Sequence, residues 1–205
     1  MLSGTVLLHE VAKRIILRYL RTRGFLDAVI ASDMLDEAEG VDLTYTTGGR
    51  RTTVKVKADA YYGIDPAKVA DRDLIYYRAE TSSYGFEAIA DSVTRRPGWL
   101  QRSSADELFY YRIALGQTEA EVAALMEEPD EVFFAELKVE RDDLKVLPMR
   151  ALQGWFDVVG DRFMSRPVLT SGRSAWHRIV PAADVEANIA GVRDLGSLFA
   201  SIALR

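Results

Sequence analysis

The sequence contains no cysteine and only two histidines, His9 and His177, and these shortages narrow the chemistry open to it. Without thiols, the chain has no disulfide framework, no thiolate zinc site and no cysteine nucleophile. A metal site built on two histidines would need both of them. Any metal is therefore expected to be held by carboxylates, which suit the hard cations Mg²⁺ and Mn²⁺.

Long hydrophobic runs are also missing. No apolar stretch approaches the ~20 residues that a membrane-spanning helix needs, and the N-terminus lacks the basic start and apolar stretch of a signal peptide. We therefore expect a cytoplasmic protein without a membrane partner. The net charge of −5 argues against general coating of a polyanion, although a local basic patch remains compatible with it.

What the sequence does contain is ordinary for a globular domain. Its 205 residues are 48% hydrophobic and 28% charged, which is enough for a sizeable core. There is no repeat, no low-complexity tract and no linker, so we expect a single domain over residues 1–205. The phosphate-loop, dinucleotide-binding and serine-elbow motifs are absent from the sequence.

A β-hairpin is the clearest local signal. Residues 40–47 alternate and are rich in β-formers, Gly48-Gly49 supplies a turn, and residues 50–57 return as a second strand. Pairing across this turn places Asp42 opposite Lys55. Because side chains alternate along a strand, Lys57 shares that face, whereas Val54 and Val56 lie on the other.

The remaining pattern predicts an α+β (α/β) fold with a central mixed β-sheet and flanking helices. Residues 104–115 favour a helix, although their aromatic residues also permit a strand. The predicted helices are 9–23, 104–115, 119–128, 149–159 and a last one from about 181, and the further strands are 25–31, 73–79, 84–90, 131–139, 144–148 and 175–180.

The hairpin face with Asp42, Lys55 and Lys57 has the residue types that phosphodiester hydrolysis uses. A carboxylate holds a divalent metal that generates hydroxide, and a lysine stabilises the developing charge. The structural alternative is a solvated sheet face, which is a common setting for strand lysines. Arginines near the expected turns are candidate contacts for a nucleic-acid backbone: Arg50, Arg51, Arg95, Arg96 and Arg102.

A helix bearing Glu10, a strand with Asp42, a glycine turn and then Val54-Lys55-Val56-Lys57 resembles the core of the PD-(D/E)XK nucleases. The resemblance implies a restriction endonuclease-like core over about residues 9–115, with an α/β extension over about 116–205. It also implies Mg²⁺- or Mn²⁺-dependent cleavage of DNA, in many such enzymes by a homodimer. Asp42 matches the family's first acid, Lys57 its catalytic lysine and Glu10 its helix glutamate. The stretch 83–111 is similar to nuclease-like proteins of phages and prophages.

Lys55 departs from the family pattern, because it stands where the second acid is expected and a lysine cannot ligate a cation. A substitute carboxylate would come from Asp59, Glu80 or Glu87, of which Glu87 is favoured. The predicted metal ligands are then Asp42, Glu87 and Glu10, with Lys55 contacting phosphate. The alternative is a catalytically silent member of the fold that binds nucleic acid or a protein. A third hypothesis is an accessory protein of a phage or mobile element whose negative charge meets a basic partner.

Overall fold

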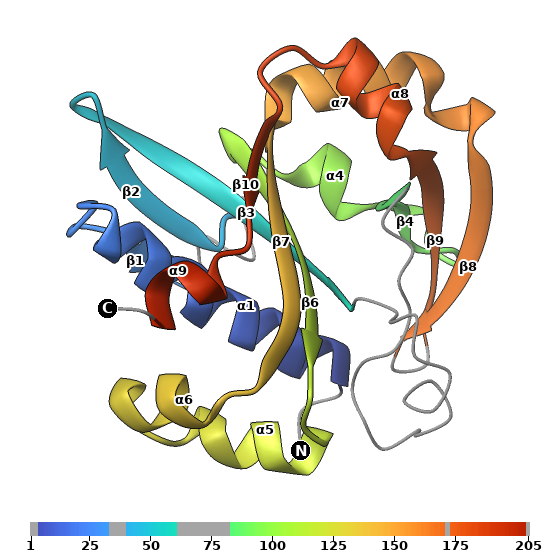
Figure 1. Ribbon diagram of the computed structural model, residues 1–205. Coiled ribbons are helices and arrows are strands. Elements are labelled where there is room, and N and C mark those ends of the chain that lie inside the picture. Colours follow the sequence, from blue (N-terminus) through green and yellow to red (C-terminus); the bar gives the residue numbers. More distant parts are fainter. Residues whose placement is uncertain (1–3, 33–39, 61–82, 171–172, 204–205) are drawn as a thin grey trace.

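The computed structural model describes residues 4–32, 40–60, 83–170 and 173–203 (Figure 1). Over these residues the fold is α+β, with a mixed sheet flanked by helices, so the predicted fold class is confirmed. The helices are α1 (Gly4–Thr22), α4 (Trp99–Arg102), α5 (Glu119–Met126), α6 (Asp130–Glu136), α7 (Met149–Val159), α8 (Ala182–Asn188) and α9 (Phe199–Ala203), with a 3-10 turn at Gly160–Arg162.

The strands form two sheets. They are β1 (Val29–Ile30), β2 (Leu43–Thr47), β3 (Arg50–Ala60), β4 (Ser83–Asp91), β5 (Arg96–Pro97), β6 (Glu107–Leu115), β7 (Val139–Pro148), β8 (Met164–Thr170), β9 (Arg173–Pro181) and β10 (Arg193–Gly196). The first sheet has the order β1-β2-β3-β6-β7-β10, in which β3 and β6 run parallel and the other pairs antiparallel. The second is antiparallel with the order β5-β4-β9-β8.

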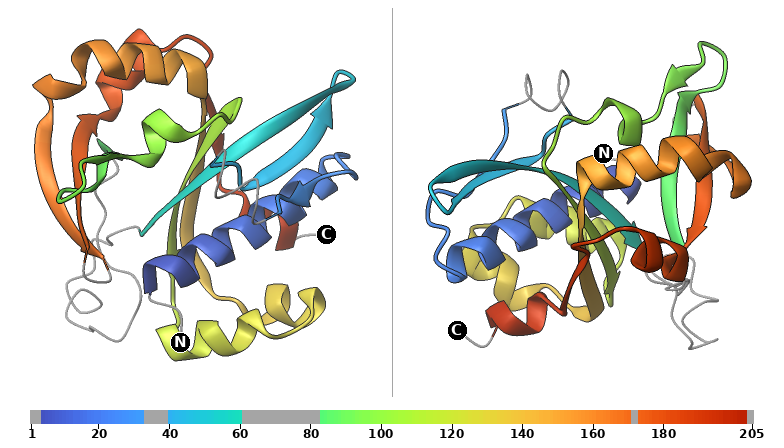
Figure 2. Two further views of the ribbon diagram at one scale, coloured as in Figure 1. Left: turned by 180° about the vertical axis from the view of Figure 1, so that it is seen from behind. Right: turned by 90° about the horizontal axis from the view of Figure 1, so that it is seen from above.

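Apolar side chains pack on both faces of the six-stranded sheet. One face is covered by α1, which lies across the back of the sheet (Figure 2, left), and by residues of α5, α6 and α9. The opposite face packs against β4, β9, α4, α7 and α8. Side chains of the central strand β6 point alternately to the two faces. Phe109 and Tyr111 therefore pack in the first core, whereas Leu108 and Tyr110 pack in the second.

The β2–β3 hairpin follows its predicted register. Leu43 pairs with Val54 and Thr44 with Thr53. The turn requires its glycines, because Gly48 and Gly49 have φ values of 56° and 76°, which side-chain-bearing residues rarely adopt. Val54 and Val56 share one face, as expected, and are buried in the core that includes α1, which leaves Lys55 and Lys57 on the face toward the second sheet.

Two favoured elements are replaced in the structure. The segment favoured as a helix over 104–115 is the central strand β6, the alternative that its aromatic residues permitted, and its residues from Leu108 to Leu115 are all buried. A continuously buried strand has the same apolar run as a buried helix, so periodicity does not separate them. The strand expected over 131–139 is instead helix α6, which follows Pro129 and has Asp130 and Glu131 in its first turn, where the helix dipole favours carboxylates.

The other elements predicted within the described residues are present, most of them with changed lengths. Helix α7 has the predicted bounds, α1 begins earlier than expected, and the strand expected over 25–31 is reduced to Val29–Ile30. The predicted strand 73–79 and Glu80 lie outside the described residues. Residues 116–205, which the resemblance implied to be an extension, contribute strands to both sheets, because β7 pairs with β6 and β9 pairs with β4. Within the described ranges, no helix is long and apolar enough to cross a membrane.

Candidate functional site

Asp42 lies just before β2, and its carboxylate is enclosed by three donors. His9 Nε2 on α1 lies 3.1 Å from Oδ1, and the Lys55 ammonium lies 3.2 Å from Oδ1 and 3.1 Å from Oδ2. The amide N–H of Val56 donates to Oδ2 at 2.6 Å. The Asp42 side chain is fully buried, so both of its oxygens are engaged within the protein.

The electrostatics of this cluster favour an ionised Asp42. Burial opposes ionisation, but the hydrogen bond from His9 and the charge of Lys55 outweigh it and hold the pKa of Asp42 below its usual value. The carboxylate is therefore compensated by an ammonium group at the distance of a direct ion pair. The residues present do not fit a divalent cation at Asp42, because both carboxylate oxygens are already engaged by His9, Lys55 and the Val56 amide and the nearest charged group is an ammonium.

The helix residue that reaches Asp42 is His9 and not Glu10. The Glu10 carboxylate instead pairs with Lys13, one turn further along α1, at 2.6 Å. Adjacent residues of an α-helix point about 100° apart, so a shift of one residue exchanges the group that faces the sheet. The sequence pattern selected Glu10 through its match to the nuclease family and passed over its neighbour, His9.

Lys57 belongs to a second cluster, further along the same face of β3. Its ammonium donates to Asp59 Oδ1 at 2.7 Å and to the carbonyl of Ala58 at 3.3 Å. The other oxygen of Asp59 accepts from the hydroxyl of Tyr110 on β6. The Tyr110 oxygen in turn accepts from the amide of Gly85 on β4 at 2.9 Å. This chain of hydrogen bonds connects Lys57 to both sheets.

Glu87 and His177 lie beside this cluster on the four-stranded sheet. They face each other across β4 and β9, with His177 Nε2 3.9 Å from Glu87 Oε2. The other oxygen of Glu87 accepts from the amide of Trp99 at 3.0 Å. Gly98 makes this close approach possible, since a Cβ there would meet the Glu87 carbonyl oxygen at 1.9 Å.

His177 is neutral at physiological pH. Burial and the nearby positive charge of Lys57 lower its pKa to about 4, although Asp59 acts in the opposite sense. The structure therefore brings Asp59 and His177 close to Lys57, and Glu87 beside His177, whereas Asp42 is paired with Lys55. The sequence does not reveal that Tyr110 and His177 lie near Lys57, because their proximity depends on the pairing of β3 with β6 and of β4 with β9.

All five arginines named as candidate phosphate contacts are exposed. Arg50 and Arg51 lie next to the hairpin turn, where Arg50 pairs with Asp106 at 2.5 Å and Arg51 donates to the Thr44 hydroxyl at 3.2 Å. The other three lie in the β4–β5 turn, at the start of β5 and at the end of α4, and the φ of Arg95 is 53°. They are Arg95, Arg96 and Arg102.

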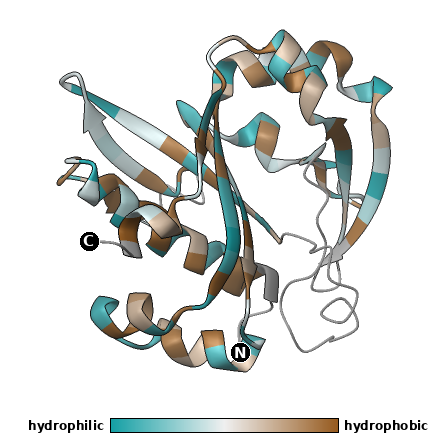
Figure 3. Ribbon diagram, viewed as in Figure 1, coloured by the Kyte–Doolittle hydropathy of each residue, from teal (hydrophilic) through white to brown (hydrophobic). Residues whose placement is uncertain are grey.

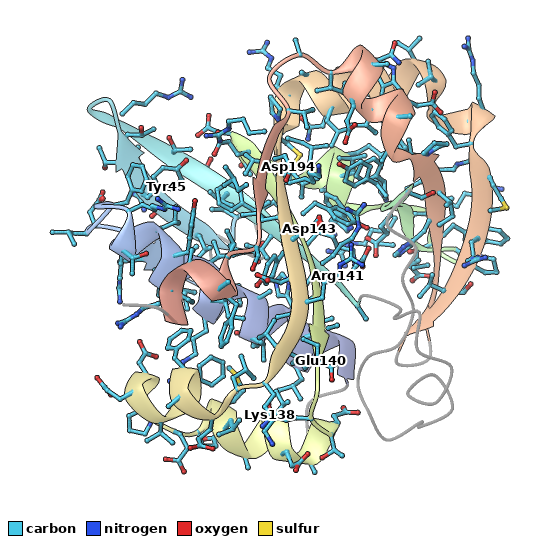
Figure 4. All side chains as sticks on the ribbon, in the orientation of Figure 1. Tyr45, Lys138, Glu140, Arg141, Asp143 and Asp194 are labelled. Carbon is cyan, nitrogen blue, oxygen red and sulfur yellow. The ribbon has the colours of Figure 1, made fainter. Side chains whose placement is uncertain are left out.

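The middle of β7 is a second polar region, visible as a hydrophilic stretch in Figure 3. Its charges are used within the fold. Asp143, labelled in Figure 4, pairs with the buried Arg112 at 3.4 Å. Asp142 is also buried and accepts from the Tyr111 hydroxyl and from the amides of Leu198 and Phe199, at the start of α9. This region therefore stabilises the structure.

Among the residues that the structure describes, no three His, Asp or Glu side chains are grouped as a metal site would require. No family model, no curated protein and no solved structure matches the chain.

Proposed function

We propose that this protein binds the phosphate backbone of nucleic acid on a nuclease-like scaffold without hydrolysing it. The resemblance of helix α1, the β2–β3 hairpin, Asp42 and Lys57 to the PD-(D/E)XK core supports the scaffold. The observation that carries the proposal is the ion pair between Lys55 and the fully buried Asp42, at 3.1 Å. A lysine takes the place of the second acid and neutralises the first, so the charge that would attract a metal is already compensated.

Exposed cations supply the binding surface in this proposal. Arginines next to the hairpin turn and around the β4–β5 turn offer charged donors to phosphate oxygens. Lys57 adds a contact on the hairpin face, because its ammonium has three N–H groups, of which two are engaged with residues that the structure describes. Since the whole chain has a net charge of −5, binding would be confined to the places where these cations are exposed.

The experiment is a binding titration of single-stranded and duplex DNA in metal-free buffer at several salt concentrations. Affinity should fall steeply with salt, because phosphate contacts release counterions. Replacing Arg50 and Arg51, or Arg95 and Arg96, with alanine should weaken binding and reduce the salt slope. Arg150→Ala on α7, an exposed arginine outside this surface, is the matched control. Binding unaffected by either pair would refute the proposed surface.

A second candidate function is the Mg²⁺- or Mn²⁺-dependent nuclease expected from the resemblance. The observation in its favour is the contact of Asp59 with Lys57, with His177 close to both, which offers a carboxylate away from the Asp42–Lys55 pair. Cleavage of plasmid DNA with either metal, lost in Lys57→Ala, would support it. Light scattering would test the homodimer that a double-strand cutter requires.

A further inference from the structure

Two hydrogen bonds fix the direction in which the Tyr110 hydroxyl donates its proton. It accepts from the amide of Gly85 at 2.9 Å, and its proton is directed to Asp59. Burial and the adjacent Asp59 charge raise the pKa of Tyr110 well above its ordinary value, so the hydroxyl keeps its proton and remains a donor. One oxygen of Asp59 is thereby fixed by a fully buried group on the neighbouring strand.

The second oxygen of Asp59 then determines where Lys57 lies. Its distance to the ammonium is 2.7 Å, and the Ala58 carbonyl accepts a further hydrogen bond at 3.3 Å. A lysine on a flexible stem ordinarily samples many rotamers, and ordering it costs conformational entropy. With two N–H groups engaged, the third has a restricted direction, and the Lys57 side chain still reaches solvent over 18% of its surface.

We infer that Tyr110 and Asp59 are positioning residues, which hold the ammonium of Lys57 in place for contact with a phosphate oxygen. The role in phosphate contact rests on the proposed function, whereas the restraint of Lys57 does not. Tyr110 acts through Asp59 and does not itself touch the ligand. The relay joins β6 of the first sheet, β4 of the second and the hairpin strand β3 at one point.

Lysine acylation by a water-soluble active ester, read by mass spectrometry without DNA, tests the restraint directly. Removing one hydroxyl in Tyr110→Phe should raise the labelling rate of Lys57 several-fold, because Asp59 loses its fixed partner. Lys138, an exposed lysine preceding β7 and labelled in Figure 4, is the internal control and should not change. Asp59→Asn tests the same restraint with the shape of the side chain retained. An unchanged Lys57 rate in both folded variants would overturn the inference.

DNA affinity tests the role in contact. Lys57→Ala should weaken binding about tenfold, the loss of one charge-assisted hydrogen bond. Tyr110→Phe should weaken it in the same direction, and the double variant should bind no more weakly than Lys57→Ala alone. Additive losses would overturn the positioning role even if labelling changes. A wild-type protein that binds no DNA would refute the proposed function instead and leave the labelling result to decide the restraint.

Discussion

Replacing Asp42 with alanine is the substitution whose cost the structure defines best. It removes the acceptor of three donors at once, namely His9, Lys55 and the amide of Val56. Removing one partner of a buried ion pair costs about 3–5 kcal/mol, because the other charge stays desolvated. The Lys55 side chain is 14% exposed and regains some hydration, so we expect about 3–4 kcal/mol, which includes the unsatisfied amide.

Urea unfolding followed by far-UV circular dichroism measures this loss. With an m value of roughly 2 kcal/mol/M, the midpoint should fall by about 1.5–2 M while m itself is unchanged. Asp42→Asn, which keeps an acceptor for Val56 but loses the charge, should lie between wild type and alanine. The control is Arg50→Ala, whose ion pair with Asp106 is exposed on the arginine side, and it should cost at most about 1 kcal/mol. A loss below 1 kcal/mol in Asp42→Ala would refute the reasoning.

Three further outcomes are expected. In the folded protein the pKa of His177 is lowered to about 4, so as the pH falls below 6.5 the unfolded state binds a proton at this histidine before the folded state does. The free energy of unfolding should therefore drop by about 3 kcal/mol between pH 7 and pH 4. His177→Gln should flatten this pH dependence, measured by urea unfolding at each pH. Lys55→Glu should lower the melting temperature in EDTA and recover it with Mn²⁺, whereas wild type should show no metal-dependent shift by calorimetry. Asp142→Ala should cost roughly 2–3 kcal/mol and speed amide exchange at Leu198, because α9 loses the acceptor at its start; normal protection there would contradict this role.

The hairpin was predictable because its signals are local. Gly48 and Gly49 fix the turn, and the alternation on both sides fixes the register that sets Asp42 beside Lys55. By contrast, β6 is buried on both faces and loses its alternation, which is why its apolar run also matched a helix.

The rest of the candidate site depends on tertiary structure. Asp59 meets Tyr110 only because β3 lies parallel to β6, a pairing between segments about fifty residues apart. His177 approaches Glu87 through an antiparallel pair that closes across ninety residues. The choice between His9 and Glu10 depends on the rotation of α1 over the sheet, which a charged helix does not reveal by composition.

The most direct test of a binding scaffold without cleavage compares wild type, Lys55→Glu and Lys57→Ala with labelled DNA, with and without Mn²⁺. We predict that wild type binds in a salt-dependent way and leaves the DNA intact with metal, and that Lys57→Ala binds more weakly. Metal-dependent cutting by wild type that disappears in Lys57→Ala would contradict the account and favour the nuclease. Failure of wild type to bind DNA at low salt would contradict it as well.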